Sequence, residues 1–287
     1  MRVRSIYKKK IKRYIVSLIR LKENKEQQRS VALRRRLQDE VVIVTGASSG
    51  IGATIAREFA QYGARVVLAA RRANELQTQV DVITGAGYQA LAIPTDITEP
   101  EQVMRLVEQV QERFGRVDVL VNNAGVGWIR PFYKEARENI DRVINVNLRG
   151  TMLATYAVLP GMIARRKGTI ISVASVAGIL PVSSLYSASK YGLRGFMLSL
   201  HHELAGTGVS ASLISPGFIR TRMAQGMPTA RLIPMPGPQV VARAALDLVL
   251  QPRREVIVPD MYVPLVAFAN TFPGLLDLAL SRFMRRA

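Results

Sequence analysis

The feature that most constrains this sequence is a short β-branched run followed by a glycine-rich turn. Residues 41–45 read Val-Val-Ile-Val-Thr, and Gly46, Gly50 and Gly52 come directly after them. An apolar run without alternation predicts a strand that is buried on both faces of a parallel sheet. Apolar residues at helical spacing follow the glycines. We therefore expect a strand, a turn and a helix, which form the first half of a βαβ unit.

This turn has the chemistry of a phosphate-binding site. Glycines let the backbone approach a pyrophosphate closely, and the helix N-terminus offers free N–H groups and the positive end of the helix dipole. The spacing differs from the commoner G-x-G-x-x-G, and a glycine-rich helix start without a ligand is the structural alternative. We predict that a dinucleotide is held here by Gly46, Ser48, Ser49, Gly50, Ile51 and Gly52.

The second predicted strand, residues 64–70, bears on the choice of cofactor. In a dinucleotide-binding fold its end faces the adenosine ribose, where an acidic residue selects NAD. This chain has Ala70 there, followed by Arg71 and Arg72. Guanidinium groups suit a 2′-phosphate because they form paired hydrogen bonds. We predict NADP as the cofactor and NAD as the less expected one. The alternative is two solvated arginines.

Tyr186 and Lys190 are four residues apart, which puts them one turn apart on one face of a predicted helix. A free tyrosine has a pKa of about 10 and is a poor acid or base at neutral pH. A nearby ammonium group favours the phenolate and lowers that pKa. The pair is a compact device for proton transfer, although the same spacing also arises by chance on polar helix faces.

Together these motifs resemble the short-chain dehydrogenase/reductase family, over about residues 37–259. The resemblance implies an α/β fold with a Rossmann-like, doubly wound parallel sheet in three layers, α/β/α. It also implies hydride transfer between a nicotinamide cofactor and a ketone or secondary alcohol. Beyond the motifs above, it rests on Asp96, Asn122-Asn123-Ala124-Gly125, Asn147, Ser175 and Pro216-Gly217, all in the family's order.

The resemblance implies four catalytic residues. Tyr186 gives a proton to the substrate in reduction and takes one in oxidation, while Ser175 hydrogen-bonds the substrate oxygen. Lys190 lowers the pKa of Tyr186 and binds the nicotinamide ribose. Asn147 holds a water that passes protons from Lys190 to solvent.

The residues themselves leave two of these assignments open. Asn145 competes with Asn147. Ser175 precedes Tyr186 by eleven residues, slightly fewer than the family pattern leads us to expect, and two other hydroxyls, Ser183 and Ser184, lie nearer to the tyrosine. We favour Ser175 because it directly follows a predicted strand.

The remaining cofactor contacts also come from the resemblance. Asp96 accepts from the adenine amino group and the backbone N–H of Ile97 meets the ring, although Asp96 also suits a helix cap. The backbone of Ile219 binds the nicotinamide carboxamide, and Thr221 contacts carboxamide or phosphate. Asn122 is expected to be scaffold. The predicted set is completed by Asn123, Ala124, Gly125, Tyr186, Lys190, Pro216 and Gly217.

The charge of +19 is concentrated at the N-terminus, because residues 1–40 carry 14 Lys and Arg against 4 acids. We expect residues 1–36 to be a basic amphipathic arm, whose apolar stripe is Ile11, Tyr14, Ile15, Leu18 and Ile19. Such a helix suits an anionic membrane surface. A targeting helix, a solvated arm and a start-site error are the alternatives.

The other end repeats this pattern. Residues 37–260 are predicted to form the oxidoreductase domain, and residues 261–287 an apolar tail that ends in arginines. A spanning helix needs roughly 20 apolar residues, so we favour contact with a membrane surface or with the domain. Residues 222–237 are expected to form an apolar substrate lid.

We therefore expect an NADP(H)-dependent oxidoreductase acting on a small carbonyl or alcohol substrate that is lipophilic. A cofactor-binding sensor or scaffold without turnover is the second hypothesis, and nucleic-acid binding through the arm is the third, with no recognition motif to support it. The chain has no cysteine, and its two histidines lack metal-ligand spacing, so we expect no metal. We expect a homo-oligomer in the cytoplasm, peripheral to a membrane.

Overall fold

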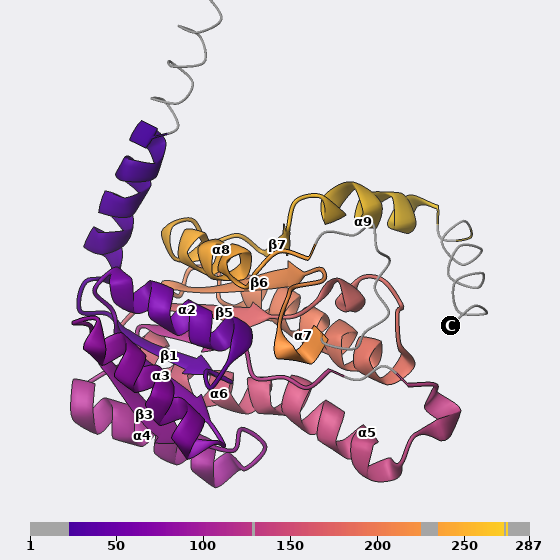
Figure 1. The fold of residues 1–287 in the computed structure, drawn as a ribbon, viewed down its shortest axis with the longest axis horizontal. Helices are drawn as coiled ribbons and strands as arrows, with labels where there is room; N and C mark the ends of the chain where they lie inside the picture. Colours follow the sequence, from indigo (N-terminus) through magenta and orange to yellow (C-terminus); the bar gives the residue numbers. More distant parts are fainter. Residues whose placement is uncertain (1–22, 128–129, 225–234, 273, 275–287) are drawn as a thin grey trace, which may run out of the picture.

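Seven short segments form one parallel sheet in the order β3-β2-β1-β4-β5-β6-β7 (Figure 1). The structure is a computed structural model, and it describes residues 23–127, 130–224, 235–272 and 274. The strand order reverses between β1 and β4, which creates the crevice where ligands bind in open α/β sheets. The predicted doubly wound α/β fold is confirmed.

The strands are β1 (Val41–Thr45), β2 (Arg65–Ala70), β3 (Ala90–Pro94), β4 (Val119–Asn122), β5 (Gly168–Val173), β6 (Val209–Pro216) and β7 (Glu255–Val258). The α-helices are α2 (Gly50–Gln61), α3 (Ala73–Gly85), α4 (Pro100–Phe114), α5 (Arg137–Ile144), α6 (Gly150–Ala164), α7 (Ser184–Glu203), α8 (Gln239–Leu250) and α9 (Tyr262–Thr271). Shorter turns are the π-helix η2 (Asn145–Arg149) and the 3-10 helices η1 (Phe132–Lys134), η3 (Val176–Gly178) and η4 (Arg222–Ala224).

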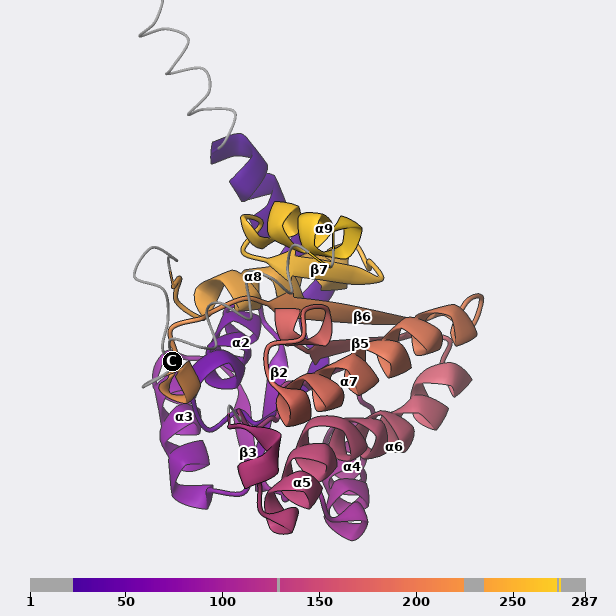
Figure 2. The ribbon, with the colours of Figure 1, turned by 90° about the vertical axis from the view of Figure 1, so that its right-hand side faces the viewer.

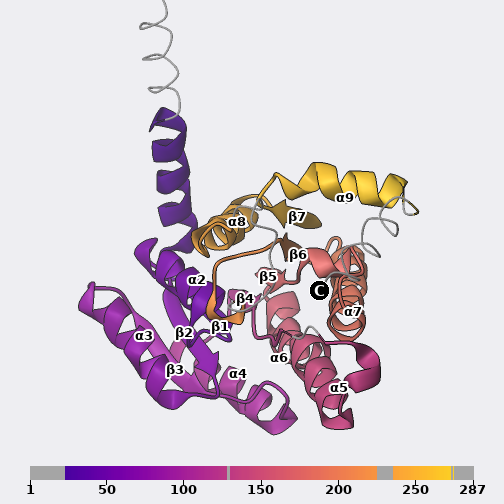
Figure 3. The same cartoon turned by 45° about the vertical axis from the view of Figure 1, so that its right-hand side comes forward.

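Helices cover both faces of the sheet (Figure 3). The β-branched residues of β1 show why: Val42 and Val44 belong to the core under α2, α3 and α8, whereas Val41 and Ile43 belong to the core under α4, α6 and α7. All four are fully buried. A strand that is apolar on both sides can be buried only in this three-layer arrangement.

A helix over residues 23–37 precedes β1. Its Leu33 and Leu37 are fully buried in the same core as α2 and α8, and Arg29 forms an ion pair with Asp247 of α8 at 2.6 Å. The last part of the predicted arm therefore packs against the domain. The division at residue 36 stays a prediction, and the apolar stripe predicted between residues 11 and 19 lies outside the described residues.

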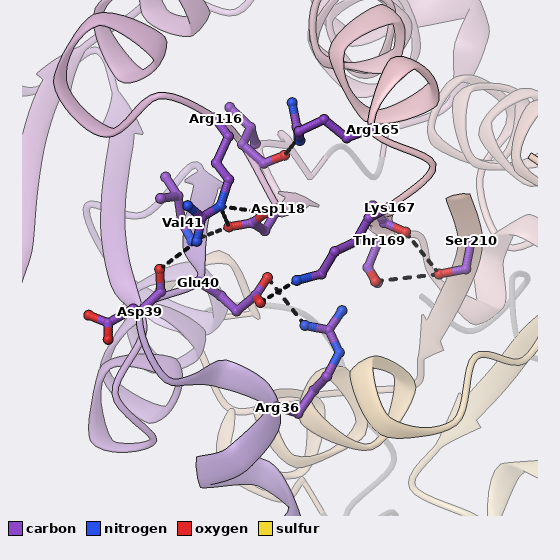
Figure 4. Close-up of polar contacts among 12 residues, drawn as sticks. Arg36, Asp39, Glu40, Val41, Arg116, Asp118, Arg165, Lys167, Thr169 and Ser210 are labelled. Carbon is purple, nitrogen blue, oxygen red and sulfur yellow. Dashed lines mark hydrogen bonds and ion pairs between the residues drawn. The ribbon is translucent and has the colours of Figure 1, made fainter. Parts of the chain in front are cut away.

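The amino edge of the sheet carries a network of charges (Figure 4). Glu40, directly before β1, is buried and forms ion pairs with Arg36 at 3.2 Å and with Lys167 at 2.7 Å. Asp118, directly before β4, is 1% exposed; it pairs with Arg116 and accepts from the backbone N–H of Val41. Each of these carboxylates forms an ion pair with a cation of the protein itself, which indicates a structural role for this edge.

The C-terminal helix α9 lies beside β7, at the end of the molecule from which the N-terminal helix also projects (Figures 1 and 2). Within the described ranges, no helix combines the length and apolar character needed to cross a bilayer. Most of the predicted lid, residues 225–234, and of the tail beyond α9 lies outside the described residues.

Candidate active site

The glycine-rich turn connects β1 to α2 and needs its glycines for two reasons. Gly46 and Gly50 have φ angles of +65° and +60°, which residues with a side chain rarely adopt. A Cβ atom at Gly46 would lie 2.7 Å from Cα of Ala124, and one at Gly52 would lie 2.5 Å from the carbonyl oxygen of Gly46. The turn therefore packs closely against the residues that follow β4, and a side chain at Gly46 or Gly52 would not fit.

The N-terminus of α2 has the features of an anion site. Ser49 is its N-cap residue, but the Ser49 side chain makes no capping hydrogen bond, and the first turn holds no acidic residue. The first N–H groups and the positive end of the helix dipole are therefore not neutralised by a side chain of the helix itself. Ile51, in this first turn, is partly buried.

The two arginines after β2 lie beside this turn. Nη2 of Arg72 donates to the hydroxyl of Ser48 at 3.0 Å, and its Nη1 pairs with Glu75 at 2.7 Å. Arg71 is mostly exposed, with Nη1 3.8 Å from Oδ2 of Asp96. Arg72 is thus held by the protein in contact with the phosphate-binding turn, which a freely solvated arginine would not be.

Asp96 forms a local turn before α4. Its Oδ1 accepts from the backbone N–H of Thr98 at 2.9 Å and from the Thr98 hydroxyl at 2.8 Å, and its own N–H donates to Gln102. The turn-forming interpretation accounts for these bonds, and the adenine contact stays a prediction. The neighbouring Ile97 is buried and packs against Gly150: a Cβ atom added at Gly150 would lie 3.0 Å from Ile97.

Asn123 ties the end of β4 to the glycine-rich turn. Its Nδ2 donates to the carbonyl oxygens of Thr45 at 3.0 Å and of Gly46 at 3.2 Å, while the Thr45 hydroxyl accepts from the N–H groups of Asn123 and Ala124. The amide that we predicted to line the cofactor therefore holds the turn in shape. Asn122 is buried and donates to hydroxyls of α6 and β5, as expected of scaffold.

The start of α7 brings the predicted catalytic pair to the carboxyl edge of the sheet. Lys190 is 4% exposed, and its Nζ donates to the carbonyl oxygen of Val173, the last residue of β5, at 3.2 Å. The same Nζ lies 5.8 Å from the ring centroid of Tyr186. The Tyr186 hydroxyl forms a hydrogen bond with Ser175, which follows β5.

The pKa values of this pair depart from the expectation drawn from the spacing. Burial raises the pKa of Tyr186, and the hydrogen bond with Ser175 opposes that rise. Burial lowers the pKa of Lys190 to about 8. The predicted lowering of the tyrosine pKa by the lysine is wrong for this arrangement, because the ammonium lies beside the ring and is bonded to the backbone, while desolvation of the phenolate dominates.

The three serines that the sequence left open differ in their surroundings. Ser175 both bonds Tyr186 and accepts from the N–H of Ala177 at 3.1 Å, so its orientation is fixed. Ser183 is the N-cap residue of α7, and Ser184 is exposed on its first turn. The contact between Ser175 and Tyr186 supports Ser175, and its catalytic role stays a prediction.

Asn147 lies in the π-helix η2, a distortion that occurs frequently at functional sites. It is fully buried, and its side chain bonds both backbone groups of Val126: Oδ1 accepts at 2.8 Å and Nδ2 donates at 3.1 Å. Nδ2 also donates to Ser189, whose hydroxyl donates to the carbonyl of Tyr186. The Asn147 side chain therefore braces the loop that contains Gly125, and the predicted water contact stays a prediction.

The loop after β6 closes the other side of the crevice. The methyl group of Thr221 would lie 3.7 Å from a Cβ at Gly50, so this loop reaches the phosphate-binding turn, and Ile219 is buried beneath it. Gly217 has no room for a side chain, because the ring of Tyr262 lies against it. The Tyr262 hydroxyl accepts from the N–H of Phe218 at 3.3 Å. Tyr262 was missed from the sequence because it belongs to no motif.

Helix α9 also contacts the loop that follows Ser175. Val266 and Ala269 of α9 form a small core with Ile179 and Leu180. The helix thus bridges the two loops that flank the predicted nicotinamide and substrate region. The apolar character of the tail, from which we expected contact with a membrane surface or with the domain, was the sequence signal for this contact.

The comparisons with known proteins agree with this geometry. The family model for short chain dehydrogenases matches residues 40–231. A short chain dehydrogenase of Pseudocercospora fijiensis is 40% identical over 193 residues, which are 66% of this chain and 62% of that protein. The 3-oxoacyl-(acyl-carrier-protein) reductase FabG of Thermotoga maritima is 38% identical over 195 residues, 67% of this chain and 79% of that protein.

Solved structures give the same result. A short-chain dehydrogenase/reductase from Burkholderia phymatum in complex with NAD has a TM-score of 0.77 at 27% identity, covering 84% of this chain and 96% of that one. A metagenomic short-chain oxidoreductase in complex with NADP has a TM-score of 0.69 at 38% identity, covering 78% and 98%. The chain belongs to the short-chain dehydrogenase/reductase family of oxidoreductases.

Proposed function

We propose that this protein is an NADP(H)-dependent oxidoreductase that interconverts a ketone and a secondary alcohol. The observation that carries the proposal is the hydrogen-bonded hydroxyl pair of Ser175 and Tyr186, with the buried ammonium of Lys190 beside the tyrosine ring. Two hydroxyls that converge next to a nucleotide-type crevice suit the oxygen of a carbonyl substrate.

The site has the shape that a dinucleotide needs. Gly46, Gly50 and Gly52 carry no side chain in the turn, and the first turn of α2 holds no acidic residue, so both fit a pyrophosphate. A bound nicotinamide would supply or accept the hydride. The protein's part is the proton. In reduction, Tyr186 donates its proton to the substrate oxygen while Ser175 hydrogen-bonds the same oxygen. Burial disfavours the phenolate, so Tyr186 carries the proton that reduction needs, although the raised pKa also makes it a weaker acid.

The preference for NADP rests on Arg71 and Arg72. Arg72 is held against Ser48, and no carboxylate follows β2 to accept from free ribose hydroxyls, because Ala70 occupies that position. Of the two similar solved structures, one is in complex with NADP and one with NAD. Our choice between the two cofactors therefore rests on the residues that follow β2. Parallel titrations with NADPH and NADH, followed by nicotinamide fluorescence, test this preference directly.

A lipophilic substrate is the finer part of the proposal. The loop after Ser175 is apolar at Ile179 and Leu180, and α9 backs it with Val266 and Ala269. The relative from Thermotoga maritima reduces 3-oxoacyl groups, so 3-oxoacyl thioesters belong in the test panel. We expect kcat/KM to rise with chain length across a series of ketones and 3-oxoacyl thioesters, measured by NADPH absorbance. A flat or falling series would contradict a lipophilic pocket.

The two competing hypotheses of the sequence are weaker than this one. A sensor or scaffold without turnover would not need the Ser175, Tyr186 and Lys190 set, which is complete here. Nucleic-acid binding through the arm has charge in its favour but no recognition motif. Binding of the full chain to DNA but not to anionic vesicles, lost at high salt, would reverse this ranking.

A second proposal, peripheral membrane contact, is favoured by the outer face of α9. Met261, Leu265, Phe268 and Phe272 fall on one stripe of the helix, and each exposes between 45% and 51% of its surface. The N-terminal helix, which carries the basic residues 1–22 in sequence, projects from the same end of the molecule (Figure 2). An exposed apolar stripe, together with a chain end that is basic in sequence, suits an anionic lipid surface.

Co-sedimentation with phosphatidylcholine vesicles, with and without phosphatidylserine, tests this contact. Phe268→Asp should weaken binding to the anionic vesicles, because a charge in the stripe opposes insertion. Val82→Asp is the matched control, since Val82 is as exposed as Phe268 but lies on α3. If the wild-type chain stays in the supernatant with both vesicles, membrane contact is wrong.

We also propose a homo-oligomer that assembles through α6 and α7. These helices expose an unusual number of large apolar side chains for a soluble surface: Met152, Tyr156 and Ile163 on α6, and Tyr191 on α7. Sedimentation of the wild type and of Tyr156→Lys tests the interface, since a lysine there should favour the monomer.

A further inference from the structure

Arg194 forms a two-pronged ion pair that links α7 to the far strand of the sheet. Nε of Arg194 lies 3.0 Å from both carboxylate oxygens of Glu255, and Nη2 lies 2.8 Å from Oε2. Glu255 is the first residue of β7, and its side chain is 11% exposed. Arg194 stands one helical turn after Lys190, on the same face of α7.

A buried hydroxyl extends this pair to β6. Ser215 is fully buried, and its Oγ donates to Oε1 of Glu255 at 2.8 Å. The next two residues are Pro216 and Gly217, which begin the predicted nicotinamide loop. Glu255 therefore joins the helix with the proton-transfer pair and the strand that leads into this loop.

Helix α7 is thus fixed to the sheet at two successive turns. Lys190 bonds the end of β5 through Val173, and Arg194 bonds β7 through Glu255, while β6 lies between these two strands. The N–H of Gly217 then donates to the carbonyl of Val258 at the end of β7. A shift of α7 along the sheet that changed the distance from Lys190 to the loop would therefore also strain the ion pair between Arg194 and Glu255.

We infer that Arg194 and Glu255 are positioning residues, which hold Tyr186 and Lys190 at a fixed distance from the nicotinamide loop. The inference rests on the proposed hydride-transfer function. Geometry favours a positioning role over simple stabilisation, because bidentate arginine–carboxylate bonding specifies orientation, whereas a buried ion pair adds little net stability compared with apolar residues. Small displacements of reacting groups are costly in rate: about 1 Å can reduce turnover by roughly 100-fold.

The chain offers a matched control at the opposite edge of the sheet. Arg116 contacts both carboxylate oxygens of Asp118, at 3.0 Å and 2.8 Å, and Asp118 is buried. This pair is also an arginine–carboxylate ion pair, although Arg116 donates to Asp118 through Nε alone, and it lies at the amino edge (Figure 4). Arg194→Met and Arg116→Met each remove one arginine–carboxylate ion pair. We therefore expect them to differ in their effect on catalysis, because the two pairs lie at different places in the fold.

The test measures kcat, KM for NADPH and the urea unfolding midpoint of both methionine variants, of Arg194→Lys and of the wild type. We expect Arg194→Met to lower kcat by roughly tenfold with a smaller change in KM, and Arg194→Lys to recover part of the loss. Arg116→Met should lower the unfolding midpoint and leave kcat within about twofold. Equal kcat in the two methionine variants, relative to the wild type, would overturn the inference.

Two further readouts keep the outcome clear. If Arg194→Met does not fold, Ser215→Ala removes one hydroxyl and retains the ion pair, so a fall in kcat without loss of NADPH binding still supports positioning. An unchanged kcat in Ser215→Ala and Arg194→Lys would overturn it. A wild-type chain that binds NADPH but turns over no carbonyl in the panel would count against the proposed function itself.

Discussion

The two edges of the central sheet are both polar, but they use their polar groups differently. At the amino edge, Glu40 and Asp118 are buried and paired with nearby cations (Figure 4). At the carboxyl edge, the buried cation is Lys190. Within the described part of the chain no carboxylate forms an ion pair with it, and its Nζ donates a hydrogen bond to a backbone carbonyl.

This difference separates structural charges from reactive ones. A buried charge that the protein neutralises internally holds elements together, whereas a buried group with a shifted pKa and a hydroxyl neighbour is available for chemistry. The carboxyl edge also carries the glycine-rich turn after β1, in which Gly46 and Gly50 have positive φ angles, and the acid-free N-terminus of α2. The comparison therefore predicts that substitutions at the carboxyl edge change turnover, and that losses at the amino edge change stability.

The largest expected effect is on turnover at the carboxyl edge. Tyr186→Phe should lower kcat by about 100- to 10,000-fold, because it removes only the transferable proton and keeps the ring beside Lys190. NADPH binding and the unfolding midpoint should stay close to those of the wild type. Steady-state kinetics with the best carbonyl of the panel measures the change, and near-normal turnover would remove Tyr186 from the mechanism.

The next largest effect belongs to the helix over residues 23–37, which leads into the amino edge. A truncation of residues 1–36 leaves β1 intact in sequence, yet it removes the fully buried Leu33 and the Arg29–Asp247 ion pair. We expect it to lower the free energy of unfolding by about 3 kcal/mol or more, as loss of a buried leucine does. Truncation of residues 1–22 is the control and should be nearly neutral in urea unfolding. Equal stability of both would show that the N-terminal helix is not part of the core.

A third prediction uses the stability of the site itself. Burial lowers the pKa of Lys190 from 10.5 to about 8, so the folded state binds fewer protons than the unfolded state between these pH values. Stability therefore rises with pH in this window, and below about pH 8 the full cost of burying the charge is present. At pH 7, Lys190→Met should stabilise the fold by about 2 kcal/mol while abolishing turnover, after allowance for the lost bond to Val173.

Urea unfolding of this variant at several pH values gives the check. The stability gain of Lys190→Met should shrink as the pH rises from 8 towards 10.5, because the wild-type lysine becomes neutral when folded. A gain that does not depend on pH would mean that packing, and not the buried charge, determines the difference.

The sequence predicted the carboxyl edge well because its residues follow local patterns. The β-branched run before Gly46, the spacing of Tyr186 and Lys190, and the serine after β5 each express one short-range rule. Parallel strands bring such strand-end motifs to one edge, so local motifs assemble without any knowledge of distant contacts. The fold class followed from the same patterns.

Contacts at the amino edge, between α7 and β7, and between α9 and the domain were not predicted residue by residue, because the partners are distant in sequence and no spacing rule links them. Glu40 meets Lys167, Arg194 meets Glu255, and Tyr262 lies against Gly217. The predicted roles of Asn123 and Asp96 were incomplete for a related reason: each side chain is engaged by a neighbouring backbone group that a motif does not specify. The direction of the Tyr186 pKa shift could not be predicted from the sequence either, because it depends on burial in the folded protein.

The smallest expected effect tests the cofactor end of the carboxyl edge. Ala70→Asp combined with Arg71→Ala should shift the ratio of kcat/KM for NADPH to that for NADH by roughly tenfold towards NADH, because one charged hydrogen bond to a phosphate is worth about 1.5–3 kcal/mol and is only partly replaced. Arg72 is retained because its bonds to Ser48 and Glu75 support the turn. Arg57→Ala on the exposed side of α2 is the control for a lost surface charge. If the wild type already prefers NADH, or if the control shifts the ratio as much as the double substitution, the arginines after β2 do not select the cofactor.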